Sequence, residues 1–130
     1  MSACPCSPSR AYADCCGLLH AGAPADSAEA LMRSRYSGYV LGEIDYLLAS
    51  WHASTRPVML EHDPPGTRWL GLEIRRHVQH DAHRATVEFV ARYRHGGAPA
   101  VRLHEVSRFV HEDGRWYYLD GTFAEAAPPR

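Results

Sequence analysis

The spacing of the hydrophobic residues changes near residue 67, and this change limits the fold more than any other feature of the sequence. Before it, apolar side chains recur every three or four residues, as in a helix with one buried face. After it, apolar and polar side chains alternate, as in a half-buried strand. Because 130 residues make one ordinary domain, the helices and the strands must share a single core.

Two helices are predicted in the first half of the chain. Residues 23–26 form a short linker, Asp26 or Ser27 caps the first helix, and Gly42 ends it. Its apolar residues keep helical offsets, at Ala28, Leu31, Met32, Tyr36, Tyr39 and Val40. Mostly polar side chains occupy the opposite face, among them Arg33, Ser34 and Ser37. A second helix begins near Glu43 and ends before a loop at residues 57–67 that is rich in Pro and Gly.

Four strands are predicted in the second half, at Trp69–His80, His83–His95, Ala100–Glu112 and Arg115–Gly121. The connections between them are short and consist of turn residues, so neighbouring strands should be antiparallel. We therefore expect an α+β fold, with helices packed on one face of a four-stranded antiparallel sheet. Strands of this length curl, and a curled sheet covered by helices can enclose a pocket.

The charge balance excludes several classes of function. With 14 Lys and Arg against 15 Asp and Glu, the formal net charge is -1. A nearly neutral chain has no excess positive charge with which to bind nucleic acid or a membrane surface non-specifically.

The N-terminus has neither the basic nor the apolar part of a signal peptide, and no apolar run is long enough to span a bilayer. We therefore expect a cytoplasmic protein with reduced thiols. All basic residues are Arg, which favours planar carboxylate or phosphate partners.

The four cysteines all lie within the first 16 residues, at Cys4, Cys6, Cys15 and Cys16. Four thiolates meet the tetrahedral requirement of a structural zinc ion, and metal binding would supply the folding energy of such a short segment. Disulfides, a redox role and free thiols are the alternatives, although a reducing compartment disfavours disulfides. His20 is an alternative fourth ligand.

The N-terminal segment resembles the SEC-C zinc motif, named for the tail of the SecA translocation ATPase. The resemblance is carried by Cys4-Pro-Cys6-Ser7, Tyr12 and Cys15-Cys16-Gly17. It implies that all four cysteines are zinc ligands. The usual Gly-Ser-Gly-Lys after the second cysteine is replaced by Ser7-Pro8-Ser9-Arg10, which leaves the ligands intact but weakens any inference about a partner surface.

The remainder resembles the YchJ-like group of uncharacterised bacterial proteins. The matching blocks are residues 28–36, Trp51-His52, Thr55-Arg56-Pro57 and residues 114–121. Some members carry a second cysteine motif at the C-terminus, whereas this chain ends in Ala-Pro-Pro-Arg. The resemblance implies a cone-shaped middle domain similar to nuclear transport factor 2, of the cystatin-like kind, and no established activity. The expected parts are a zinc-binding leader at 1–22, the α+β domain at 23–122 and a tail at 123–130.

Two carboxylates are candidates for a site inside the sheet. Glu105 and Asp120 lie on the apolar faces of the third and fourth strands, and burial would raise their pKa and suit them to acid or base catalysis. Their neighbours on those faces are Leu103, Ser107, Phe109, Trp116 and Tyr118. The opposite faces are nearly as apolar, and a slip of one residue would place Glu105 in water.

Three basic side chains complete the candidates for a pocket. His52 follows the second helix, near an expected pocket mouth, where it could act as an acid, a base or a packing residue. Arg33 and Arg35 lie on the first helix and could pair with carboxylates or bind an anionic ligand or partner.

The functional hypothesis from the sequence is a non-enzymatic protein-interaction module with a structural zinc ion. A small-molecule or enzymatic pocket and a redox or metal-handling role are the alternatives. No catalytic motif supports an enzyme. A half-covered sheet also suggests a homodimer through its open face.

Overall fold

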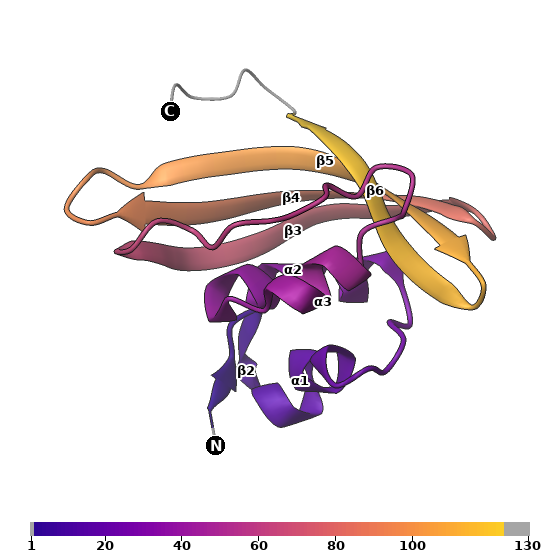
Figure 1. The fold of residues 1–130 in the computed structure, drawn as a ribbon, viewed down its shortest axis with the longest axis horizontal. Helices are drawn as coiled ribbons and strands as arrows, with labels where there is room; N and C mark the ends of the chain where they lie inside the picture. The colour runs from indigo at the N-terminus through magenta and orange to yellow at the C-terminus, as the bar shows by residue number, and fades with distance from the viewer. Residues whose placement is uncertain (1, 124–130) are drawn as a thin grey trace.

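The structure is a computed structural model that describes residues 2–123. It has three layers, with the sheet on one side, two helices in the middle and the N-terminal leader on the other side (Figure 1). Within residues 2–123, no helix is long and apolar enough to cross a membrane. Most of the expected tail at 123–130 lies outside the described residues.

The helical layer consists of α2 (Ala28–Leu41) and α3 (Ile44–Ala49). Ser27, rather than Asp26, caps α2, because its hydroxyl accepts a hydrogen bond from the Ala30 amide at 3.1 Å. Gly42 ends α2 in the left-handed conformation at φ 73°, as predicted.

The sheet contains β3 (Thr67–Asp81), β4 (Arg84–His95), β5 (Val101–Glu112) and β6 (Arg115–Phe123). Their order is β3-β4-β5-β6, and every neighbouring pair is antiparallel, which confirms the predicted meander. Residues 50–66 connect α3 to β3, and in Figure 1 this segment passes in front of the sheet.

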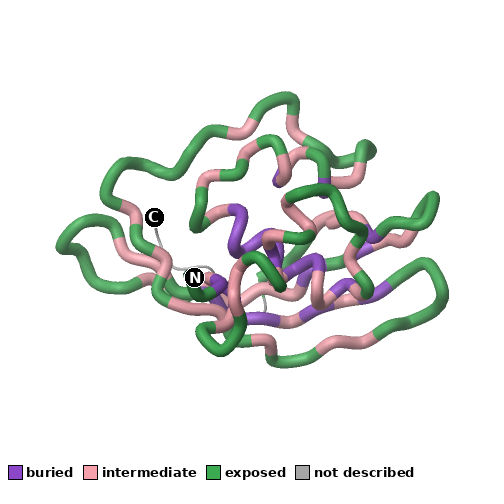
Figure 2. The backbone as a smooth tube through the Cα atoms, turned by 90° about the horizontal axis from the view of Figure 1, so that it is seen from below, coloured by how far each residue is buried: buried purple, intermediate pink, exposed green. Residues whose placement is uncertain are grey.

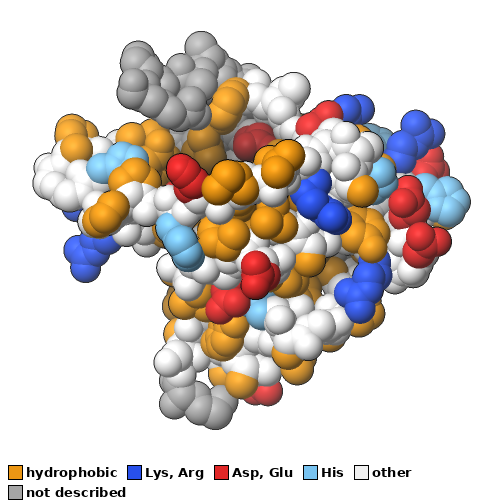
Figure 3. All heavy atoms as spheres, in the orientation of Figure 1, with side chains coloured by type: hydrophobic (Ala, Val, Ile, Leu, Met, Phe, Trp, Pro, Cys, Tyr) orange, Lys and Arg blue, Asp and Glu red, His pale blue; other side chains and the backbone are white. Residues whose placement is uncertain are grey.

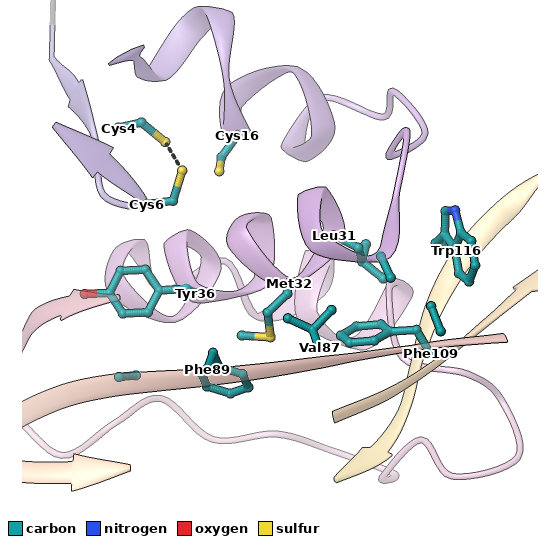
Figure 4. Close-up of a cluster of buried hydrophobic side chains, with 13 residues drawn as sticks. Cys4, Cys6, Cys16, Leu31, Met32, Tyr36, Val87, Phe89, Phe109 and Trp116 are labelled. Carbon is teal, nitrogen blue, oxygen red and sulfur yellow. Dashed lines mark hydrogen bonds between the residues drawn. The ribbon is translucent and has the colours of Figure 1, made fainter. Parts of the chain in front are cut away.

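The leader folds into β1 (Ala3–Cys4), β2 (Ser7–Ala11), a 3-10 turn (Tyr12–Asp14) and α1 (Cys16–His20). It does not form a core of its own. Three of its cysteines belong to the same cluster of buried side chains as α2 and the inner face of the sheet. Figure 4 shows this cluster extending from the cysteines across α2 to the sheet.

The packing of the leader makes α2 the most deeply buried helix. Ser34 and Ser37, which the helical pattern places on the polar outer face, have no exposed surface. Ser34 donates to the Leu31 carbonyl at 2.7 Å and lies 2.6 Å from the Tyr46 hydroxyl, so its burial leaves no polar atom unpaired. Figure 2 shows the buried positions concentrated in the middle of the molecule. The expectation of one buried face is wrong because the leader covers the other.

Candidate metal centre and cavity

The cysteines form a compact group at the interface between the leader and α2. The sulfur atoms of Cys4, Cys6, Cys15 and Cys16 all lie within 4.8 Å of one another. A tetrahedral zinc site with ordinary zinc–sulfur bonds separates its sulfurs by about 3.8 Å. The sulfur of Cys6 lies 3.6 Å from that of Cys4 and 3.5 Å from that of Cys15. These distances fit a bound ion and exclude disulfide bonds, and all four thiols are free.

The local fold explains how the sulfurs meet. The antiparallel pairing of β1 with β2 turns the chain sharply after Cys4, and this turn presents Cys4 and Cys6 on the same side. The 3-10 turn then leads into α1, where Cys15 and Cys16 occupy the junction. In Figure 4, the side chains of Cys4, Cys6 and Cys16 point toward a common centre above α2.

The electrostatics of the cluster favour a cation at that centre. Hydrogen bonding from the Cys16 thiol is the main cause that lowers the pKa of Cys6 to about 5, despite the opposing effect of burial. Burial is the main cause that raises the pKa of Cys15 to about 11, and the hydrogen bond with Cys6, together with burial, raises the pKa of Cys16. These directions favour loss of the proton at Cys6, and a divalent metal ion would replace the protons of the other thiols.

Arg33 joins the leader to α2. Its guanidinium donates to the backbone carbonyl of Cys6 at 3.3 Å and pairs with Glu29 at 3.0 Å. The positive charge also helps to lower the pKa of Cys6. Arg33 therefore pairs with a carboxylate, which is one of its two expected roles, and it also contacts the cysteine cluster.

His20 is not part of the sulfur cluster. Its Nε2–H donates to the Ser34 carbonyl at 2.9 Å, so its Nδ1 accepts from the Tyr12 hydroxyl at 2.7 Å. Both ring nitrogens are thus engaged, and the ring also packs against Tyr46 with centroids 4.5 Å apart. His20 joins α1 to α2, and the four thiols are close enough to hold a metal ion without it.

A cavity of about 480 Å³ lies between α2, the inner face of the sheet and the segment before β3. Its walls are largely aromatic, formed by Tyr36, Tyr39, Trp51, Trp69, Tyr93 and Tyr118. Figure 3 shows hydrophobic and acidic side chains next to one another on the face where residues 50–66 cross the sheet. The aromatic residues of the sequence therefore line an open space as well as a core.

Glu105 points into this cavity, as the strand pattern predicts. Its Oε2 accepts hydrogen bonds from Ser107 at 2.7 Å and from the Tyr118 hydroxyl at 3.2 Å. Burial, with the neighbouring Glu105 charge, raises the pKa of Tyr118, so the phenol stays protonated and donates.

Asp120 does not join Glu105, and the prediction of a buried carboxylate there is wrong. Arg108 lies opposite Asp120 and Phe109 opposite Tyr118, so Leu119 is an extra residue in β6. This bulge turns Asp120 to the outer face of the sheet. There it binds Arg108 through two hydrogen bonds of 2.6 and 2.5 Å, which lower its pKa instead of raising it.

Arg35 is the buried cation of the cavity wall, with 3% of its surface exposed. One guanidinium nitrogen, NH1, donates to the Leu47 carbonyl at 2.8 Å and to the Ser50 hydroxyl at 2.7 Å. The group also lies 4.8 Å from the Trp51 ring centre and 4.5 Å from that of Tyr118. Burial lowers its pKa. Helical spacing alone does not distinguish this residue from Arg33.

His52 lies outside the cavity, which corrects its expected place at a pocket mouth. Its Nδ1 accepts from the Ser54 amide at 3.1 Å, so its Nε2–H donates to Glu112 at 3.1 Å. Its own amide donates to the Tyr118 carbonyl at 2.7 Å, so the residue fastens the end of the helical layer to β6. Asp63 and Trp69, which the sequence did not single out as a pair, instead line the cavity and share a hydrogen bond of 3.0 Å.

Comparison with known proteins places this geometry in a group of relatives. Residues 27–121 match the family described as YchJ, middle NTF2-like domain. A UPF0225 protein of Polaromonas sp. is 61% identical over 114 residues, which cover 85% of this chain and 81% of that protein. A UPF0225 protein of Bordetella parapertussis is 58% identical over 123 residues, 92% of each chain.

Two solved structures share the whole arrangement. The solution structure of a SEC-C motif containing protein from Rhodopseudomonas palustris is 37% identical, with a TM-score of 0.82 over 95% of this chain and 99% of that one. The crystal structure of a SEC-C motif containing protein from Psychrobacter arcticus is 30% identical, with a TM-score of 0.79 over 98% and 86%. The leader and the sheet therefore recur together.

Proposed function

This chain belongs to the UPF0225 family, and from that premise we propose that it is a non-enzymatic interaction module stabilised by one structural zinc ion. The observation that carries the proposal is the group of four sulfurs within 4.8 Å of one another. Four thiolates close the coordination shell of zinc and leave no position for a substrate or water, which is typical of structural sites. Such a site fits a cytoplasm that keeps thiols reduced.

The position of the cluster supports a structural role over a redox role. Cys4, Cys6 and Cys16 are buried between the leader and α2, so an external thiol or disulfide has little access to them. Among residues 2–22, these three cysteines are the buried ones, and hydrogen bonds of Arg33 and His20 also join the leader to α2. The ion would therefore fix the leader in place over α2.

Elemental analysis of the purified chain tests the metal assignment. We expect one zinc per chain, reduced to less than half in a Cys16→Ser variant, because three ligands hold zinc more weakly than four. A Ser9→Ala variant in the exposed part of β2 is the matched control and should keep its zinc. Iron in place of zinc, or no metal at all, would contradict the proposal.

The open face of the sheet offers the interaction surface of the module. Its arginine face consists of Arg68, Arg92 and Arg94, and the strand register places Arg68 opposite Arg94. Like charges directly opposite one another destabilise a sheet, so this arrangement has a cost that an anionic partner would offset. Within residues 2–123, no carboxylate pairs with Arg68, Arg92 or Arg94, and the Nε atom of Arg94 is buried without a partner.

The acidic residues of the same face indicate which anion fits. Glu73 and Glu88 lie further along the same outer face and are paired with Arg75 and His104. These carboxylates would repel a phosphate backbone that continued along the strands. A short acidic protein segment can instead place its side chains on the arginines alone, two residues apart, where guanidinium groups bind carboxylates in a planar fork.

Fluorescence anisotropy with a labelled peptide of alternating glutamates tests this surface. The wild type should bind the peptide in a salt-dependent way, and an Arg92→Gln, Arg94→Gln double variant should bind at least about tenfold more weakly. The Arg84→Gln variant is the control, because Arg84 lies at the other end of β4 and pairs with Asp81. Removal of opposed charges should not lower the melting temperature of the double variant.

Two experimental results would show that the arginine face binds something other than an acidic protein segment. Tighter binding of a single-stranded oligonucleotide than of the peptide would contradict the protein partner. A dimer in sedimentation velocity that the double variant abolishes would identify a second copy of this chain as the occupant.

A further inference from the structure

The cavity beneath α2 is separate from the cysteine cluster and has the size of a small-molecule site. Its volume of about 480 Å³ lies within the range of ligand pockets, roughly 300–1,000 Å³. The buried residues Arg35, Phe89 and Ser107 line its inner end, whereas the exposed Asp63 and His95 line its opening. A ligand would therefore enter beside Asp63 and reach inward toward Ser107.

One wall of the cavity is built from the Trp69 ring and three tyrosine rings around it. The Trp69 ring centre lies 5.6 Å from that of Tyr36, 6.0 Å from that of Tyr39 and 5.2 Å from that of Tyr93. Aromatic rings offer a large apolar surface with a negative face, which attracts positive charge. This wall suits an apolar or aromatic body that carries a cation.

Two carboxylates with free acceptor capacity face the same space. At Glu105, Oε2 accepts from Ser107 and Tyr118, and Oε1 accepts no hydrogen bond from any residue of 2–123. At Asp63, Oδ2 accepts from the Trp69 indole and Oδ1 likewise has no donor in that range. An ionised carboxylate can accept about four hydrogen bonds, so both groups can still accept from a ligand.

Among residues 2–123, Arg35 is the one arginine that lines the cavity, and its guanidinium already has partners within the protein. The guanidinium lies between the rings of Trp51 and Tyr118, and its NH1 donates to the Leu47 carbonyl and the Ser50 hydroxyl. The cavity is thus lined by two carboxylates, Glu105 and Asp63, and by one guanidinium, that of Arg35, which is enclosed by its own partners. Negative charge is therefore in excess.

We propose that this cavity binds a small organic cation, namely a protonated amine on an aromatic or apolar body. The ammonium group donates to Glu105, and the body lies along the rings around Trp69. Because a buried charge is costly without a partner, the amine and Glu105 neutralise one another inside the cavity. The site does not depend on the proposed partner of the arginine face.

Isothermal titration with three probes of one shape tests the charge preference. Phenethylamine is cationic, phenethyl alcohol is neutral and phenylpropanoate is anionic at neutral pH. We expect the amine to bind at least about tenfold more tightly than the alcohol, and the anion to bind least. A Glu105→Gln variant should lose this preference and bind amine and alcohol alike.

Two further variants separate loss of the site from loss of the fold. Asp120→Asn removes a carboxylate from the outer face of the same sheet and should leave amine binding unchanged. Gly121→Ala should weaken amine binding, because a Cβ at this position collides with the Glu105 carboxylate. Tighter binding of phenylpropanoate, equal amine binding by the Glu105→Gln variant, or no heat with any probe up to its solubility limit would each overturn the proposal.

Discussion

Arg35 holds three parts of the structure together, and its replacement by Met should lower the free energy of unfolding by about 2–4 kcal/mol. The side chain extends from α2, donates to α3 and the residue that follows it, and lies against the ring of Tyr118 in β6. It has 3% of its surface exposed, so water does not replace these contacts in the folded protein.

The expected change in the free energy of unfolding is the difference between two terms. The contacts of the Arg35 guanidinium stabilise the fold, and the removal of its charge from water destabilises it. Each hydrogen bond from the charged NH1 contributes about 1.5–3 kcal/mol, and a desolvated cation–π contact adds about 2 kcal/mol. Burial of the guanidinium costs several kcal/mol, which Met avoids while it keeps much of the packing. The Ser50 hydroxyl also still donates to the Leu47 carbonyl at 3.1 Å, so the variant leaves no buried donor unpaired.

Urea unfolding followed by circular dichroism measures the change. Arg33→Met is the comparison on the same helix. Arg33 is partly exposed, its pair with Glu29 should contribute about 0.3–0.5 kcal/mol and its hydrogen bond to the Cys6 carbonyl about 0.5–1.5 kcal/mol. If Arg35→Met costs no more than Arg33→Met, the buried guanidinium does not connect α2, α3 and β6 as described.

Two further substitutions test local features. His20→Phe removes the hydrogen bonds to Tyr12 and Ser34, so it should lower the free energy of unfolding by about 1–3 kcal/mol. The zinc content should stay at one per chain, and a loss of zinc would instead indicate that His20 is a ligand. Arg108 lowers the pKa of Asp120 below its usual 3.8, so their exposed pair stabilises the fold above that pH and loses its effect as the pH falls. Asp120→Asn should therefore cost at most about 1 kcal/mol at neutral pH and less as the pH falls below 3.8, and a cost independent of pH in urea titrations would contradict this.

The alternation of apolar residues was sufficient to predict the sheet and its antiparallel order. It also predicts the inward direction of Glu105, because β4 and β5 pair without interruption. The alternation gives the wrong direction for Asp120, because the extra residue Leu119 reverses it. A leucine at this position does not indicate a bulge in the sequence. Only the register between β5 and β6 reveals that reversal.

The helical period was sufficient to place α2, and it was misleading about which faces of α2 are buried. Ser34 and Ser37 are buried by the leader, a segment distant in the sequence whose docking leaves no periodic signal. The same limit applies to Arg33 and Arg35, which are two residues apart and have unrelated surroundings. The four cysteines, by contrast, could be grouped in advance because their short spacing forces them together.

The central claim is that one zinc ion fixes the leader on α2, and hydrogen exchange before and after chelation tests it most directly. Removal of the ion should release protection at residues 3–20 and in α2, where the leader covers Ser34 and Ser37, while the central strands β4 and β5 keep theirs. Intact mass measured on the same samples should show one zinc lost and four reduced thiols. Unchanged protection of the leader after the metal is gone, or a mass two or four daltons low from disulfides, would contradict the account.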